Sequence, residues 1–190
     1  MANVMLSEKE FLLWQNADFI LTKNSIIHKI QTSLGQVSAA YQKAAMQLPT
    51  EFCAISPKIA KGENYKGLPW LMLDYPRLFG KEDILAIRSF CWWGNCFSIH
   101  LHMKGKYLPI FAPAALQNLR DEWKINTSQE WEHDIDAPCY KTNNGLIYNK
   151  EMKVVRIAKK IPLQQLAIVE ENFISSFKEI LAVLVAKTVK

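Results

Sequence analysis

The sequence predicts the α+β class: an antiparallel sheet of about five strands with two N-terminal helices, one mid-chain helix and a long C-terminal helix. The expected order is α-α-β-β-β-α-β-β-α. Three observations support this prediction. Apolar residues recur at helical spacing at both ends of the chain. Residues 84–103 alternate as a β-hairpin around a Gly-Asn pair. Most strands follow one another directly, without the regular strand-helix alternation that is typical of a parallel sheet.

Size and composition indicate a globular protein. With 190 residues, 49% hydrophobic and 22% charged, we expect a single domain, 1–190, in which a helical segment 1–48 packs on a body formed by 65–187. The net charge of +5 comes from scattered lysines, so nucleic acid is not expected as a partner. No apolar run reaches the roughly 20 residues of a membrane span, and none is predicted. The four cysteines lack metal-site spacing and the N-terminus lacks signal-peptide features, which predicts a reduced, cytoplasmic protein.

Two amphipathic helices are expected first. A Ser-x-x-Glu capping box at Ser7 begins a helix over about 8–21. A second, longer helix follows Asn24 and ends at Pro49. Gly35 inside it costs about 1 kcal/mol relative to alanine.

The chain then changes from helical to strand patterns. Residues 49–66 contain two prolines and little periodicity, which predicts a long surface connection. A strand is expected from Trp70 to Tyr75, ended by Pro76. The hairpin of residues 84–103 follows.

The hairpin is the segment in which the sequence specifies a register. A two-residue turn at Gly94-Asn95 pairs Trp93 with Cys96 and Arg88 with Leu101. One face is then apolar apart from Arg88, and holds Ile84, Ala86, Phe90, Trp92, Phe97, Ile99, Leu101 and Met103. The other face is half polar, and holds Leu85, Ile87, Ser89, Cys91, Trp93, Cys96, Ser98, His100 and His102.

Beyond the hairpin, Pro113 is placed as the first residue of a helix. That helix would present Leu116, Leu119 and Trp123 on one face. Two weaker strands are expected at 131–135 and 153–161. A final helix over about 163–186 has the strongest helical periodicity of the chain. It either covers the sheet or, through its last turns, forms a homodimer seam or a groove for a protein partner.

Two charges stand in apolar strands and require a partner. Arg88 lies on the apolar face of the hairpin, and Asp74 lies in the preceding strand. Because an unpaired buried charge costs several kcal/mol, we expect the two to meet, either as a salt bridge that fixes the strand register or in a pocket. In the pocket interpretation, Arg88, helped by Arg77 or Lys66, holds an anionic ligand between aromatic walls. The pocket residues are Asp74, Arg77, Arg88, Trp70, Tyr75 and Trp92.

The histidines offer a second candidate site. His100 and His102 stand two apart on one strand, so their imidazoles point the same way and could share a metal. His133, between two acids, could supply a third ligand. The alternative is that these histidines form the polar face of a sheet or a face covered by a partner, and no cofactor is predicted.

The function expected from these observations is binding rather than catalysis. The chain contains no phosphate-binding glycine loop, no GxSxG and no HExxH. We therefore expect a non-catalytic module that binds a partner or a small ligand. The alternative is a small enzyme or metal-dependent protein that uses the Arg88/Asp74 pocket or the His100/His102 face. The order of elements is loosely similar to that of secretion-chaperone-like domains, which bind partners, but only in architecture.

Overall fold

Within residues 4–188 the sheet has seven strands, all antiparallel, in the order β1-β2-β3-β4-β7-β5-β6. The computed structural model describes residues 4–188. The strands are β1 (Lys58–Tyr65), β2 (Leu68–Phe79), β3 (Ile84–Trp92), β4 (Cys96–Lys104), β5 (Trp123–Asn126), β6 (Lys141–Thr142) and β7 (Val154–Pro162). The helices are α1 (Glu8–Trp14), α2 (Ala17–Ala45), α3 (Leu108–Asn118) and α4 (Val169–Val185), with 3₁₀ turns η1 (Thr50–Phe52), η2 (Gly105–Tyr107) and η3 (Leu163–Ile168).

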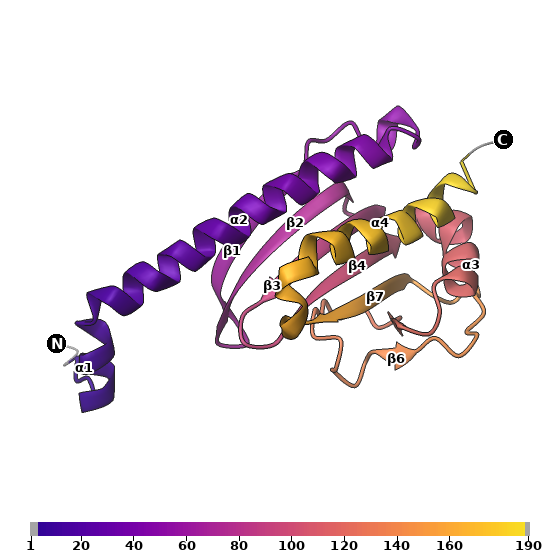
Figure 1. Cartoon of the computed structure of the whole chain (residues 1–190). Coiled ribbons are helices and arrows are strands. Elements are labelled where there is room, and N and C mark those ends of the chain that lie inside the picture. The colour runs from indigo at the N-terminus through magenta and orange to yellow at the C-terminus, as the bar shows by residue number, and fades with distance from the viewer. Residues whose placement is uncertain (1–3, 189–190) are drawn as a thin grey trace.

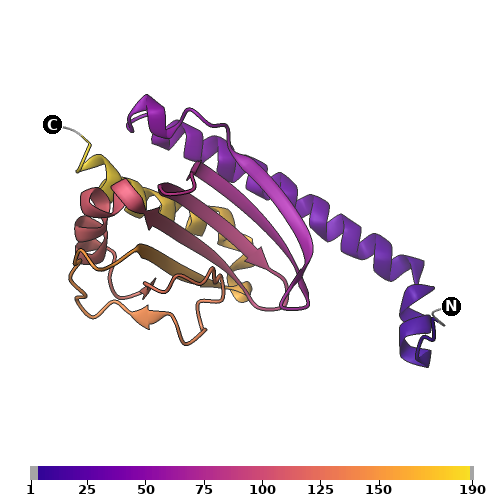
Figure 2. The ribbon, with the colours of Figure 1, turned by 180° about the vertical axis from the view of Figure 1, so that it is seen from behind.

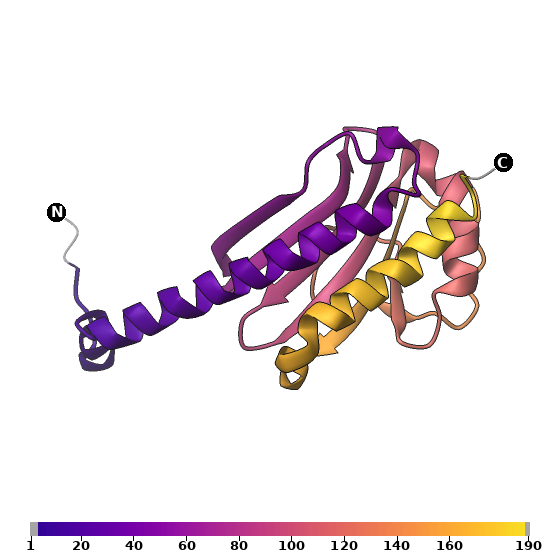
Figure 3. The same ribbon diagram turned by 45° about the horizontal axis from the view of Figure 1, so that its top comes forward.

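Helices cover one face of the sheet. Helices α2 and α4 lie side by side across it, and α3 closes one end (Figures 1 and 3). The Tyr41 ring of α2 stacks on Phe177 of α4 at 3.8 Å between centroids. The Tyr41 hydroxyl donates to the carbonyl of Phe173 at 3.1 Å and lies 2.7 Å from Oγ of Ser89 on β3. One buried phenol therefore joins both helices to the sheet.

The opposite face is covered without helices. The irregular segment 127–140, between β5 and β6, lies over strands β3, β4 and β7 (Figure 2). This covering loop carries polar and aromatic side chains, and it meets a row of polar side chains on the sheet beneath it. A buried polar layer thus lies on one side of the sheet and an apolar core on the other.

Helix α1 and the first turns of α2 project beyond the sheet (Figures 1 and 3). No residue of α1 is buried, and Ile27 is the first buried residue of α2. The projecting part is nevertheless rich in large apolar side chains that are exposed: Val4, Met5, Leu6, Phe11, Leu12, Leu13, Trp14, Phe19, Ile20, Leu21 and Ile26.

The α+β class and the antiparallel sheet are confirmed, with seven strands rather than about five. The capping box at Ser7 is also present, but the first helix ends at Trp14 rather than near residue 21. Asn16 caps the next helix by accepting the Phe19 N–H at 2.9 Å, so α2 begins before Asn24 and runs through it.

The predicted connection over 49–66 is wrong, because it contains β1. Strand β1 is an edge strand with mostly exposed side chains, so its sequence lacks the apolar alternation of an inner strand. The prediction that Pro76 ends its strand is also wrong. A bulge between Asp74 and Arg77 accommodates the proline, and β2 continues to Phe79.

In the C-terminal half, strand β7 confirms the prediction for 153–161 within a residue at each end. The mid-chain helix begins at Leu108 rather than Pro113, and Trp123 belongs to β5. Residues 131–135 are not a strand, because they lie in the covering loop, above the sheet. The predicted last helix divides into η3 and α4.

The hairpin register differs from the prediction by one residue. The turn has three residues, so Trp92 pairs with Cys96 and Arg88 pairs with His100. Gly94 adopts a φ of +72°, and the Asn95 N–H donates to the carbonyl of Trp92. A shift of one residue moves every side chain of β4 to the other face. The histidines of β4 therefore join Arg88, while Phe97, Ile99, Leu101 and Met103 join the helix-covered core.

The apolar stripe of α4 is used inside the chain. Phe173, Phe177, Ile180, Leu181 and Leu184 are buried against the sheet and its neighbouring helices. The surface proposed for a dimer seam at this helix is therefore largely occupied. Within residues 4–188, no helix is both long and apolar enough to cross a membrane.

Replacing Gly35 by alanine should stabilise the protein. Gly35 lies in α2 with open space where a Cβ would be, so the substitution lowers the entropy of the unfolded chain without a clash. We expect the free energy of unfolding to rise by about 0.5–1 kcal/mol in urea titrations. The matched control is Gly94→Ala, which should destabilise because of its positive φ. Equal effects at both positions would contradict this account.

Candidate functional site

The two charges that the sequence singled out form a buried ion pair. Asp74 and Arg88 are direct register partners on β2 and β3. Nε of Arg88 donates to Oδ1 of Asp74 at 2.7 Å, and Nη2 donates to Oδ2 at 2.8 Å. Both side chains are nearly inaccessible, at 3% for Asp74 and 8% for Arg88. The guanidinium and the carboxylate thus satisfy each other in a two-pronged pair.

The other four residues of the predicted pocket contact different partners. Arg77 instead donates from Nε to the carbonyl of Ser56 at 2.6 Å. Tyr75 belongs to the helix-covered core. Trp70 stacks on Phe90, and Trp92 packs against the ring of Tyr65. The structure therefore joins Asp74 and Arg88 but does not place Arg77 or Tyr75 beside them.

The remaining nitrogen of the Arg88 guanidinium, Nη1, contacts the covering loop. Nη1 of Arg88 lies 3.0 Å from Nε2 of His133, and the guanidinium carbon lies 5.4 Å from the ring centroid of Trp131. The indole N–H of Trp131 also donates to Nε2 of His133, at 2.8 Å. One arginine thus connects two strands to two loop residues.

A second anchor fixes the same loop. The Tyr65 hydroxyl of β1 donates to the carboxylate of Glu132 and accepts the backbone N–H groups of His133 and Asp134 at 3.1 and 3.0 Å. Lys66 forms ion pairs with both acids, at 3.1 and 2.9 Å. Burial and the bond to Glu132 raise the pKa of Tyr65 to about 12, so the phenol stays protonated and able to donate.

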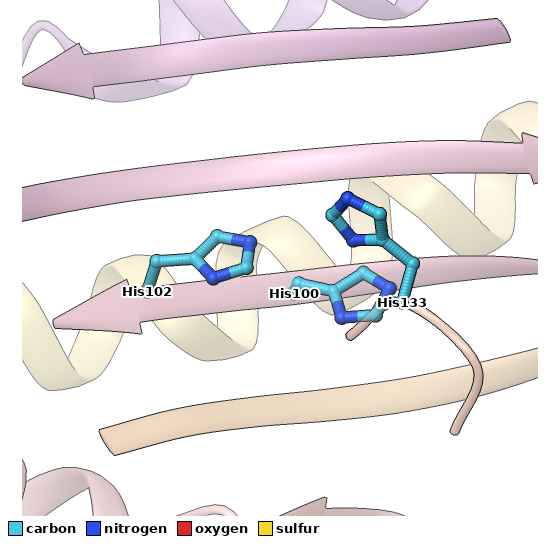
Figure 4. A group of neighbouring side chains, drawn as sticks. All are labelled: His100, His102 and His133. Carbon is cyan, nitrogen blue, oxygen red and sulfur yellow. The ribbon is translucent and has the colours of Figure 1, made fainter. Parts of the chain in front are cut away.

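The three histidines that the sequence offers as candidate metal ligands do come together. His100 and His102 project from β4, and His133 projects from the covering loop (Figure 4). One ring nitrogen of each lies within 4.8 Å of the others, and all three residues are buried. The sequence therefore identified this group, although the predicted register placed it on the wrong face.

Hydrogen bonds assign the proton on two of these rings. Nε2 of His133 faces two donors, Trp131 and Arg88, so it must accept and Nδ1 must carry the proton. That N–H has no partner in the structure. The Tyr140 hydroxyl donates to the carbonyl of Glu132, so Nδ1 of His100 donates to Tyr140 and its Nε2 accepts from Ser98.

All three imidazoles are neutral. Burial, followed by the charges of neighbouring residues, places the pKa of His100 and of His102 well below the usual value. Burial and the nearby Arg88 lower the pKa of His133 to about 3. Each ring therefore offers one N–H and one lone pair rather than two N–H groups.

Arg156 is, with Trp131 and Gln129, among the residues of this site that the sequence analysis missed. It is the register partner of His102 on β7 and is 3% exposed. Its Nη1 donates to the carbonyls of Ser128 and Glu130 at 2.8 and 2.9 Å, and its guanidinium lies 4.9 Å from the ring centroid of Trp131. Within residues 4–188, no carboxylate forms an ion pair with it, and its Nε is unpartnered.

A pocket of about 190 Å³ opens beside these residues. It is lined by Ile84, His102, Met103, Lys104, Gln129, Trp131, Val154 and Arg156. Both ring nitrogens of His102 are buried and unpartnered, like Nε of Arg156. The Trp131 side chain stacks on His102 and is partly exposed, so it separates the buried polar groups from solvent.

The electrostatics of the site favour an anion over a cation. A zinc ion needs a lone pair from each histidine, but the lone pair of His133 is occupied by Trp131 and Arg88. Two guanidinium groups flank the rings, and among residues 4–188 only Arg88 is neutralised by an acid. The unpartnered groups that can donate include Nε of Arg156, Nδ1 of His133, Oγ of Ser128 and one nitrogen of His102.

The comparisons with known proteins found no matching family model, curated protein or solved structure. The site is therefore interpreted from its own geometry.

The neutral histidines predict a loss of stability in mild acid. Their pKa values are lowered in the folded state, so the unfolded chain binds more protons below pH 6.5, and stability falls as pH decreases through that window. Each ring contributes about 1.4 kcal/mol per pH unit at most. Urea unfolding between pH 7.5 and 5, with a chelator present, measures this slope.

His102→Gln should reduce the slope by about a third, because it removes one of three buried imidazoles. The control is His28→Gln, at an exposed position of α2, which should leave it unchanged. A free energy of unfolding that stays constant from pH 7 to 5 would contradict the assignment of neutral rings.

Proposed function

We propose that this protein binds a small anionic molecule, bearing a carboxylate or phosphate group, in the pocket between Trp131, His102 and Arg156. The observation that carries the proposal is Arg156. It is a buried guanidinium that lines a pocket, has an unpartnered Nε and pairs with no carboxylate of the described residues. Buried charges in proteins are normally paired, so the missing partner is expected to be a ligand.

The contrast with Arg88 supports this assignment. Both arginines lie on the same face of the sheet and beneath the same indole, at 5.4 and 4.9 Å from the Trp131 ring. Arg88 has Asp74 as its counter-charge, whereas Arg156 has only backbone carbonyls from the covering loop. Carbonyl oxygens satisfy two hydrogen bonds but do not neutralise a charge.

Other pocket residues suit an anion of modest size. Lys104 adds a second positive charge at the rim, and Gln129 adds an amide. His102, neutral and unpartnered, can donate one hydrogen bond from its ring. Ile84 and Val154 supply apolar contacts, and Trp131 supplies a flat wall. A pocket of about 190 Å³ fits a short carboxylic acid or a phosphate ester better than a nucleotide.

A binding panel tests the proposal. Inorganic phosphate, succinate and glycerol phosphate would be titrated by calorimetry and by thermal unfolding at fixed ionic strength. We expect at least one anion to bind with one site per chain and to raise Tm. Arg156→Met should weaken that binding at least tenfold, because it removes the charge while keeping the length of the side chain.

Arg77→Met is the matched control, since Arg77 contacts Ser56 and does not line this pocket. It should bind the anion as the wild type does. If no anion of the panel binds, or if Arg156→Met binds as tightly as Arg77→Met, the proposal is wrong.

A transition metal is the second candidate, favoured by the three ring nitrogens within 4.8 Å of one another. Tetrahedral zinc would need these nitrogens about 3.4 Å apart and would displace the Trp131 and Arg88 bonds to His133. Zinc titration of the wild type and of His133→Gln separates the two functions. Stoichiometric zinc that is lost in His133→Gln would replace the anion proposal with a metal centre.

A further inference from the structure

The N-terminal arm, residues 4–26, has an apolar surface that the rest of the chain does not cover. Helix α1 has no buried residue, and the arm projects away from the sheet (Figure 3). Large exposed apolar patches on soluble proteins mark interaction surfaces. Eight side chains form the main part of this surface: Phe11, Leu12, Leu13, Trp14, Phe19, Ile20, Leu21 and Ile26.

The apolar stripe of α2 continues past the end of the sheet. Ile27 and Leu34 of α2 are buried against the sheet and its helices. One helical repeat earlier, Ile20 lies on the same side of the helix as Ile27 but is 42% exposed. The arm therefore presents the same face that packs in the core, and no segment of the described chain covers it.

A hollow at the base of the arm is also apolar. It has a volume of about 150 Å³ and lies between α2, the tip of the β3–β4 hairpin and η3. Its lining includes Ile26, Ile30, Trp92, Trp93, Leu163 and Leu166. The arm of the same chain cannot fill this hollow, because α2 is continuous and leads away from it.

We propose that the arm pairs with the arm of a second copy of this chain, antiparallel and across a two-fold axis near Ile20. In such a pair, residue 17 of one copy, at the start of α2, lies level with residue 23 of the other. The start of α2 in each copy then points toward the hollow at Ile26 of its partner. The same surface serves both copies, as a two-fold dimer requires.

The available area matches a stable dimer. At about 200 Å² for a large apolar side chain, the exposed fractions of the eight residues amount to about 800 Å² per copy. Specific interfaces bury about 800 Å² per partner. The arm therefore exposes apolar surface on the scale of a specific interface, counted over all sides of its two helices.

The charges of the arm favour a second copy over a lipid surface. Between residues 4 and 26 it carries three acids, Glu8, Glu10 and Asp18, against two lysines. Helices that lie on anionic membranes carry an excess of lysine and arginine on the polar face. The arm has a small negative charge instead.

Light scattering during size-exclusion chromatography, over a range of concentrations, tests the proposal with the full chain. We expect the wild type to have the mass of a dimer and Phe19→Asp to be a monomer with unchanged helix content, because Phe19 is exposed within one chain. Met46→Asp is the control, since Met46 is also exposed but lies beyond the other end of α2. It should remain a dimer.

Cysteine cross-linking tests the antiparallel register. Ile20→Cys should form a disulfide-linked dimer on mild oxidation, because the two copies of residue 20 lie near the axis. Ile26→Cys, at another exposed position of α2, should not exceed the wild-type background, because its two copies lie about 18 Å apart along the paired helices.

Four results would overturn the proposal. They are a monomer at every concentration, a dimer that Phe19→Asp does not dissociate, linkage at residue 26 equal to that at residue 20, and flotation of a monomer with anionic lipid vesicles. The anion-binding proposal does not depend on any of them, because its pocket lies on the other face of the sheet.

Discussion

The ion pair between Asp74 and Arg88 is the interaction on which the polar side of this molecule depends. It joins β2 to β3 through two short hydrogen bonds, and its remaining nitrogen reaches His133 of the covering loop. Replacing one partner would leave a buried charge alone, which costs about 3–5 kcal/mol. Arg88 has its counter-charge within the chain. We therefore interpret it as a residue that fixes the strand register and holds the loop, and not as a ligand-binding residue. The covering loop, in turn, buries the three histidines and Arg156 against the sheet.

The layer that the covering loop buries has more positive charge than negative charge, and the proposed ligand site is inferred from this excess. The buried layer contains two guanidinium groups but only one acid paired with them, and its histidines are neutral. Several N–H groups there have no acceptor. If the covering loop served only to cover the sheet, apolar residues could do so at a lower cost in folding free energy, since buried unpaired polar groups destabilise the folded state. An anion in the pocket beside Arg156 would supply the missing charge and an acceptor for donors that line the pocket, at the edge of the layer that Trp131 borders.

Much of this could be predicted from the sequence. The capping box, the apolar stripe of α4 and strand β7 follow from local patterns, and two charges in apolar strands identified the Asp74–Arg88 pair. The hairpin register could not be predicted, since a two-residue and a three-residue turn at Gly94 are equally compatible with the local sequence, and the choice decides which face receives His100.

Strand β1 was missed because the side chains of an edge strand need not alternate between apolar and polar. Arg156 was missed although it carried the same signal as Arg88, a charge between Val155 and Ile157. The covering loop is held by contacts from Tyr65 and Arg88, distant in sequence, and local patterns do not reveal such contacts.

The central claim is that Arg88 anchors the covering loop in addition to pairing with Asp74. Hydrogen exchange of the double variant Asp74→Leu/Arg88→Met tests it directly, because removing both charges avoids a lone buried ion and allows the sheet to stay folded. The account predicts faster exchange at the amides of His133 and Asp134, which donate to Tyr65 in the wild type, with amides of β3 and β4 still protected. Arg77→Met, which leaves the loop contacts intact, should exchange as the wild type does. Loop amides as protected in the double variant as in the wild type would contradict the account.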